Sequence, residues 1–301
     1  MWSPNGKKMA FFARPPGERF LDIYVINADG TGETNLTRTK ASTEATPSWS
    51  PDSKKITYLR GSDPSAEIFT DIYVMNSDGT SQTRLIKARD IKYFEVGFES
   101  PEWSPDGEKI AFMRTTRIIP DNSAPSSAAP ITGPSGLYLM KPDGSGLRKL
   151  SKEMFYAHSP IWSPDGKQIA FSGPEEKVYV VNANGTQLKR LLPNVRTYID
   201  SYAWSPDGKE IAFAAVNYRG ELDIYVIDAD DTVQTNLTST RDSIEGELAW
   251  SPDGKQIAFT RGDVGDVYGD RDVYVMDADG TGQKRLANNA SSPSFVHWEG
   301  E

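Results

Sequence analysis

The ten residues WSPDGKQIAF occupy Trp162–Phe171 and return without change at Trp250–Phe259. The shorter signature Trp-Ser-Pro also begins at Trp2, Trp49, Trp103 and Trp204, and a seventh tryptophan, Trp298, lacks the Ser-Pro. Successive tryptophans lie 42 to 59 residues apart. A repeat of this period indicates one supersecondary unit that is used several times along the chain.

Two further residue types, a tyrosine and a leucine, recur at equivalent positions and define six units. They are Tyr24, Tyr73, Tyr138, Tyr179, Tyr225 and Tyr274, followed by Leu36, Leu85, Leu150, Leu191, Leu237 and Leu286. Each unit contains four short β-rich runs separated by Ser-Pro-Asp-Gly and Asp-Gly turns, and such dipeptides between β-rich runs indicate hairpins. No segment of helical length has a helical period. The sequence therefore predicts an all-β fold, a six-bladed β-propeller of four-stranded antiparallel blades, in which the Trp, Phe and Tyr side chains fill the space between blades.

The first unit begins at Trp2, which is too late for it to contain its own innermost strand. The tail Ser292–Trp298 matches the strand that ends at Trp49, so we predict that this C-terminal strand closes the ring by pairing with the strand that contains Met9–Ala13. Trp2 and Trp298 would then occupy the same position in the first blade, so one of the two side chains must be displaced. We expect residues 1–301 to form a single domain. The alternative is that the chain is a fragment of a longer array of repeats.

The pattern WSPDGKxIAF…DIYVMDADGTGxxRL resembles the PD40 (WD40-like) repeat of the TolB family of propellers, and the resemblance covers essentially the whole chain. It implies a binding role in the cell envelope, where TolB works with envelope lipoproteins and Tol-system partners. Similar repeats occur in the propellers of prolyl-oligopeptidase-like peptidases and of the tricorn protease, whose catalytic groups lie on a separate domain. No G-x-S-x-G nucleophile motif occurs in this sequence.

Composition limits the partners. The chain carries 33 Lys and Arg against 42 Asp and Glu, a formal charge of −9, which disfavours nucleic acid and anionic membranes. It has no cysteine, and no apolar run of membrane-spanning length, so we expect no membrane insertion. We expect a monomer that is located in the periplasm or outside the cell, and a cytoplasmic location stays open. The first residues do not have the pattern of a signal peptide; if the protein is exported, its signal peptide has already been removed.

Acidic residues and a histidine stand shortly before the tryptophan in five of the six units. They are Glu44, Glu99, His158, Asp200 and Glu245, with Glu247 two positions further on. In a closed ring these loops face the mouth of the central channel, and several carboxylates together favour Ca²⁺ or another divalent cation, or a cationic ligand group. Arg60, Arg114 and Arg261 form a column of their own on the same face, with Arg14 close by, and could instead bind the carboxylates in a purely structural network.

Two function classes remain open at this point. The first is a non-catalytic scaffold that presents its loop-bearing face and central channel to a protein or peptide partner. Candidate apolar grooves lie near Tyr93, Phe94 and Phe98 or near Phe155 and Tyr156. The second is a metal-dependent hydrolase or lyase that uses the carboxylates of the channel mouth. Two Asn-Leu-Thr sequons, at Asn35 and Asn236, fall in predicted strands.

Overall fold

The computed structural model describes residues 1–61, 71–87, 94–118, 131–132, 136–151, 158–174, 177–191, 199–217, 219–229, 233–241, 243–263 and 271–287. The chain divides into two compact units, one of residues 1–162 with 183–186 and the other of residues 163–182 with 187–301. Among the described residues there is no helix with the length and hydropathy of a membrane span.

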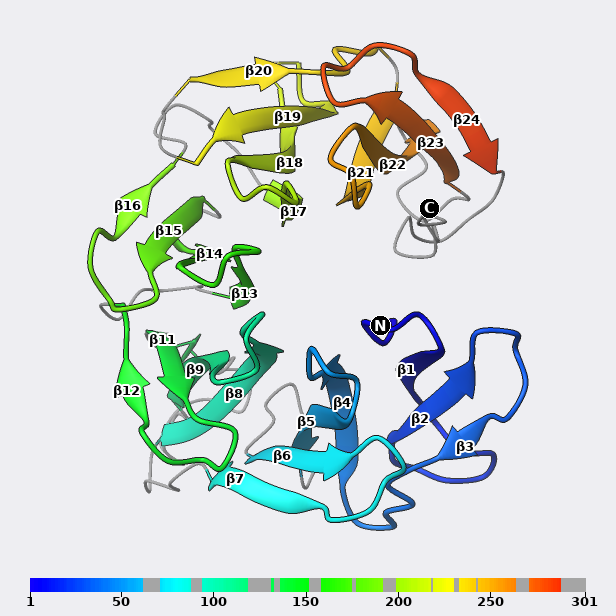
Figure 1. Cartoon of the computed structure of the whole chain (residues 1–301), viewed down its shortest axis with the longest axis vertical. Helices are drawn as coiled ribbons and strands as arrows, with labels where there is room; N and C mark the ends of the chain where they lie inside the picture. The colour runs from blue at the N-terminus through cyan, green and yellow to red at the C-terminus, as the bar shows by residue number, and fades with distance from the viewer. Residues whose placement is uncertain are drawn as a thin grey trace, which may run out of the picture. The chain divides into compact units, whose positions relative to one another are not determined.

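Six antiparallel sheets, labelled in Figure 1, follow one another along the chain. The first three are β1(Lys8–Ala13)-β2(Asp22–Asn27)-β3(Thr34–Asn35), then β4(Thr43–Trp49)-β5(Lys55–Gly61)-β6(Asp71–Asn76)-β7(Thr83–Lys87), then β10(Ile131–Thr132)-β9(Ile110–Ile118)-β11(Gly136–Met140)-β12(Arg148–Lys149), with β8(Phe94–Trp103) also paired to β9. The last three are β13(His158–Trp162)-β14(Gln168–Ser172)-β15(Val178–Asn182)-β16(Lys189–Arg190), β17(Ile199–Trp204)-β18(Glu210–Val216)-β19(Leu222–Asp228)-β20(Gln234–Asn236) and β21(Ser243–Trp250)-β22(Gln256–Asp263)-β23(Asp272–Asp277)-β24(Lys284–Ala287).

One sheet per sequence repeat confirms the predicted all-β, six-bladed fold class. The first sheet has three strands among the described residues, as expected from a unit that begins at Trp2. The tail Ser292–Trp298, predicted to supply its fourth strand, lies outside the described residues, and ring closure stays a prediction.

The Ser-Pro-Asp-Gly turn is held by its own side chains. In the second sheet the Ser50 hydroxyl donates to Asp52 (2.7 Å) and accepts from the backbone N–H of Lys55 (2.9 Å). The same bonds recur at Ser104, Ser163, Ser205 and Ser251. The last turn position needs a left-handed backbone, so it is glycine in most units, for example Gly107 with φ 71°. These requirements explain why the opening motif repeats so closely.

The hydrophobic core lies between neighbouring sheets. One cluster joins Ala10, Ile23 and Val25 of the first sheet to Trp49 and Ile56 of the second. Three tryptophans also link neighbouring sheets by a hydrogen bond, in which the indole N–H donates to the backbone carbonyl of the residue that precedes the previous tryptophan. These bonds are Trp49 to Met1 (3.2 Å), Trp162 to Glu102 (3.2 Å) and Trp250 to Ala203 (3.3 Å).

The aromatic columns differ in burial, which corrects part of the sequence prediction. Phe112, Phe171, Phe213 and Phe259 are fully buried, as Tyr58 is in the same column. Phe11, the sixth member of this column, is half-buried. The six tyrosines of the next strand stack on these rings, but only Tyr225 is buried and the other five are half-buried. The prediction that Tyr179 fills the core was therefore wrong in degree: the residue is half-buried, and its ring stacks on Phe171 at a centroid distance of 5.7 Å.

The two Asn-Leu-Thr triplets have a structural role. The Asn35 amide nitrogen donates to the buried carboxylate of Asp22 (2.6 Å), and Asn236 makes the equivalent bond to Asp223 (2.8 Å). Two other sheets place an Arg–Asp ion pair at this position, Arg84–Asp71 and Arg285–Asp272. The asparagines therefore join β2 to β3 and β19 to β20, and their amides are already engaged inside the fold.

Candidate functional site

Glu44, the first predicted ligand, is fully buried and bound within its own sheet. Its Oε1 accepts a hydrogen bond from Arg60 Nε at 2.8 Å and another from the Ser42 hydroxyl at 2.8 Å, and the Thr39 hydroxyl donates to Oε2 at 2.9 Å. The Arg60 guanidinium lies over the Tyr73 ring, 4.2 Å from its centroid. Burial raises the pKa of Glu44, and the bonds from Ser42, Thr39 and Arg60 only partly oppose this shift.

Glu245 repeats this arrangement in the last sheet. Arg261 Nε donates to its Oε1 at 2.8 Å, the hydroxyls of Thr240 and Ser243 also donate to it, and Arg261 lies 4.6 Å from the Tyr274 centroid. Burial again raises the pKa of the carboxyl, opposed by Thr240 and Arg261. The predicted pairing of this Arg column with the carboxylates is thus present in two sheets.

The remaining predicted residues come from several sheets. Glu99, whose pKa is raised by burial, lies on β8 opposite Met113, and the next residue, Arg114, lies over the Tyr138 ring at 5.7 Å. His158 begins β13 with its Nδ1 3.1 Å from the Ser159 hydroxyl, and Asp200 lies in β17. Arg14 and Glu247 are exposed. Within the described ranges no three His, Cys, Asp or Glu side chains form a group that could hold a metal ion.

The predicted apolar grooves are only partly visible. Phe98 is 2% exposed and makes an edge-on contact with Phe112 in the core, so it does not line a surface groove. Tyr93, Phe155 and Tyr156, and the side chain of Phe94, lie outside the described residues.

Among the described residues, β1 forms one edge of the first sheet. Trp2 pairs with Met9 in the register that Trp49 has with Ile56, and Met1 and Ala10 exchange two backbone hydrogen bonds of 2.6 and 2.8 Å. Trp2 therefore holds the tryptophan column of the first sheet. Beyond Met1, no described strand pairs with this edge of β1.

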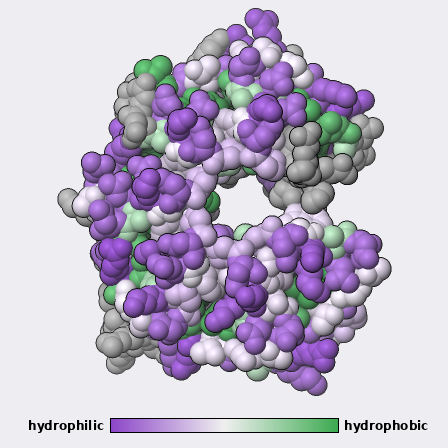
Figure 2. Space-filling view, viewed as in Figure 1, coloured by the Kyte–Doolittle hydropathy of each residue, from purple (hydrophilic) through white to green (hydrophobic). Residues whose placement is uncertain are grey.

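Phe12, on β1, is exposed. Its side chain is 48% exposed, whereas the equivalent residues of the other five sheets are at most 1% exposed. Those residues are Leu59, Met113, Ser172, Ala214 and Thr260. Figure 2 shows a mostly polar face, and Phe12 is the aromatic member of the few large exposed hydrophobic residues in the described part of the chain.

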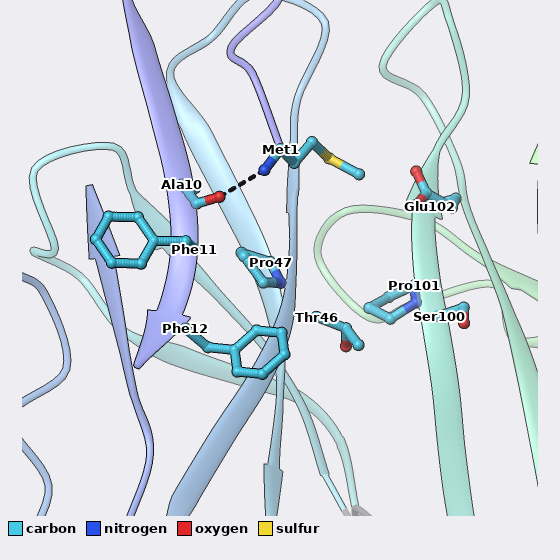
Figure 3. Close-up of a pocket in the computed structure, with 9 residues that line it drawn as sticks. All are labelled: Met1, Ala10, Phe11, Phe12, Thr46, Pro47, Ser100, Pro101 and Glu102. Atoms are coloured by element: carbon cyan, nitrogen blue, oxygen red, sulfur yellow. Dashed lines mark hydrogen bonds between the residues drawn. The ribbon is translucent and has the colours of Figure 1, made fainter. Parts of the chain in front are cut away.

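A cavity of about 360 Å³ lies beside this edge, within the first unit. Figure 3 shows its walls: Phe11 and Phe12 from β1, Thr46 and Pro47 from β4, and Ser100, Pro101 and Glu102 from β8, with Met1 and Ala10 completing the lining. Thr46 and Ser100 have left-handed φ angles of 46° and 47°, at a bulge in each strand. A β-branched residue in this conformation is strained, which makes the bulges candidates for a functional role.

Glu102 is the charged side chain of this lining. Its Oε2 accepts a hydrogen bond from the Ser48 hydroxyl at 3.0 Å. The side chain is half-buried beside the cavity, and this burial raises its pKa to about 7; the Ser48 bond and the nearby Met1 ammonium only partly oppose the shift. Burial also lowers the pKa of that ammonium.

Glu102→Gln should change how stability depends on pH. The folded-state pKa of about 7 exceeds the value of 4.5 for an ordinary Glu, so the folded protein binds the proton more readily between these values and becomes more stable as the pH falls from 8 toward 5. The variant keeps an acceptor for Ser48 and lacks this titration, so at pH 8 it should be more stable than the wild type by on the order of 2–3 kcal/mol.

Urea unfolding at pH 5 and at pH 8 measures this effect. The difference between variant and wild type should shrink toward pH 5, while titration of Glu44 and Glu99, which is common to both proteins, cancels in that difference. A constant difference across this range would contradict an elevated pKa for Glu102.

A family model described as the TolB β-propeller domain (PD40) matches residues 1–119 and 133–299. The chain belongs to this family. Among curated proteins, the uncharacterized peptidase YuxL of Bacillus subtilis is 35% identical over 69 residues, which is 23% of this chain and 8% of that peptidase.

Solved structures share the fold of this TolB-family chain. TolB from Acinetobacter baumannii is 17% identical with a TM-score of 0.59, and the match covers 95% of this chain and 64% of that one. An oligogalacturonate lyase in complex with manganese is 17% identical with a TM-score of 0.70, covering 100% of this chain and 78% of that one. A puromycin hydrolase is 16% identical with a TM-score of 0.71, and the match covers 94% of this chain and 45% of that one. Proteins with different activities thus share this fold.

Proposed function

We propose that this chain is a non-catalytic binding module that takes a protein or peptide partner at the cavity beside β1. The observation that carries the proposal is the exposure of Phe12 next to the apolar walls formed by Pro47 and Pro101. An exposed aromatic residue in a concave apolar site is a common anchor for a partner. The TolB family supports a binding role, and we propose a periplasmic or extracellular location and a monomeric chain.

Site-specific cross-linking tests this function. A photoreactive benzoyl-phenylalanine is placed at position 12 and, as the control, at position 147, where Leu147 is 50% exposed in the same unit. After irradiation in an extract of the source cells, mass spectrometry should identify one polypeptide attached at position 12 and absent at position 147. Attachment only to residues 288–301 of this chain, or equal labelling at both positions, would contradict the proposal.

The alternative is a metal-dependent hydrolase or lyase that uses the predicted carboxylates with Ca²⁺ or another divalent cation. The fold match to a manganese-bound lyase is the observation that supports this alternative. Against it, the carboxylates of Glu44 and Glu245 already accept bonds from arginine, serine and threonine.

Thermal melts with and without millimolar Ca²⁺ or Mn²⁺ separate the two roles. A site occupied only in the folded state raises the melting temperature, by RT ln(1 + [L]/Kd) in free energy. If the predicted residues hold a cation, it should raise the melting temperature of the wild type and not that of the Glu44→Gln/Glu245→Gln variant. No response in either protein would leave the arginine pairs as purely structural.

A further inference from the structure

In the second and sixth sheets, the charge of one arginine is compensated by its neighbours. Arg60 lies opposite Glu44 on β4 and opposite Asp71 on β6. Arg84 on β7 in turn pairs with Asp71 at 3.6 Å, so the four positions carry two cations and two carboxylates. The equivalent positions of the sixth sheet repeat this balance with Arg261, Glu245, Asp272 and Arg285.

The third sheet keeps both cations and has neither carboxylate. Arg114 lies opposite Phe98 on β8 and opposite Gly136 on β11. Lys149 on β12, opposite Tyr138, takes the position of the second cation. Its side chain lies beside Gly136, since a Cβ built on this glycine would be 3.4 Å from Lys149 Cε. These four positions therefore carry two positive charges and no negative one.

Strand register reveals this difference, and the spacing in the sequence conceals it. Glu99 was predicted as the counterpart of Glu44, but Phe98 is the residue that lies opposite Arg114, as Glu44 lies opposite Arg60. Successive residues of a strand point to opposite faces of the sheet. Glu99 therefore lies on the face away from Arg114, and cannot replace the missing carboxylate.

The third sheet also lacks a glutamine that completes the other two sites. Gln82 Oε1 accepts a hydrogen bond from Arg60 Nη2 at 3.1 Å, and Gln283 Oε1 accepts one from Arg261 Nη2 at 2.8 Å. Leu147 holds the equivalent position, one residue before β12, and is 50% exposed. An apolar side chain cannot accept a hydrogen bond from the third arginine.

Arg114 consequently has donors to spare beside an aromatic ring. Within the described part of the chain, its guanidinium makes one hydrogen bond, from Nη1 to the Tyr138 hydroxyl at 3.4 Å, and lies 5.7 Å from the centroid of the same ring. Arg114 is half-buried, so its surface remains accessible from solvent. A guanidinium is weakly hydrated, and its planar fork of donors matches the two oxygens of a carboxylate.

We propose that Arg114 binds a carboxylate group of a ligand on the third sheet, beside Tyr138 and Lys149. The ligand carboxylate accepts hydrogen bonds from the guanidinium, the role that Glu44 and Glu245 have toward the other two arginines. Lys149 adds a second positive charge. This site goes beyond the proposed function, because it is separate from the cavity beside β1 and does not depend on what pairs with that strand.

The side-chain Nε–H signals of the arginines test this site within one NMR sample. The full chain is isotope-labelled, the signals are assigned through their bonded carbons, and sodium acetate is titrated against sodium chloride at equal ionic strength. We expect the Arg114 signal to move saturably with acetate. The signals of Arg60 and Arg261, whose Nε already donates to a carboxylate at 2.8 Å, should hardly move. No saturable movement at Arg114, equal movement of the three signals, or the same movement with chloride would overturn the proposal.

Leu147→Gln supplies the missing acceptor from within the chain. Position 147 is exposed, so the substitution leaves the core intact, and the glutamine can accept from Arg114 as Gln82 does from Arg60. Acetate should then bind Arg114 at least threefold more weakly. Leu188→Gln makes the same change at the equivalent position of the fourth sheet, where Leu188 is 37% exposed, and should leave the Arg114 titration unchanged. Equal weakening by both variants, or no weakening by Leu147→Gln, would overturn Arg114 as the acetate site.

Discussion

Phe171→Ala should lower the free energy of unfolding by about 3–5 kcal/mol, as is typical of a large-to-small change in a close-packed core. Phe171 is fully buried on β14, and its ring is covered by Tyr179 on the neighbouring strand. Truncation leaves a cavity that neighbouring strands cannot fill, since their positions are fixed by backbone pairing. Urea unfolding followed by tryptophan fluorescence measures the loss.

Tyr179→Ala is the matched control. Tyr179 is half-buried, so its removal should cost only about 1–2 kcal/mol, from partial burial and the lost ring contact. Equal losses for the two variants would mean that the half-exposed column carries as much of the core as the buried one, contrary to the packing described above.

Gly144→Ala should cost about 3 kcal/mol. Gly144 ends the Asp-Gly turn of the third sheet with a φ of 82°, and a Cβ added there would lie 2.6 Å from the backbone carbonyl oxygen of Leu85 in the preceding sheet. The variant therefore combines the strain of a left-handed alanine with a clash against backbone that cannot move freely.

Gly30→Ala isolates the first of these two contributions. Gly30 occupies the equivalent turn of the first sheet with a φ of 80°, and an added Cβ would meet no atom within 4 Å. Its replacement should cost about 1 kcal/mol, from backbone strain alone. Thermal or urea unfolding of the two variants compares them directly, and a Gly144→Ala variant as stable as Gly30→Ala would show that the sheets can separate at this turn.

The sequence by itself determined the fold, because the requirements of each blade are local. Ser, Asp and Gly at fixed spacing close the turn through bonds within six residues, and alternating apolar residues between turns define the strands. These contacts hardly depend on the rest of the molecule, so a repeated motif was sufficient to predict six sheets and their order. The pairing of Arg60 and Arg261 with carboxylates was also among the sequence alternatives.

Tertiary structure decided which side chains are buried and where the open surface lies. The Phe and Tyr columns are equally aromatic in sequence, and only the packing of one sheet against the next buries the phenylalanines and leaves most tyrosines half-exposed. The cavity was missed because Phe12, Pro47 and Glu102 come from three different sheets. The missing first strand and the Thr46-Pro47 and Ser100-Pro101 dipeptides were its sequence signals, but exposure and an elevated pKa arise from surrounding atoms that no local pattern specifies.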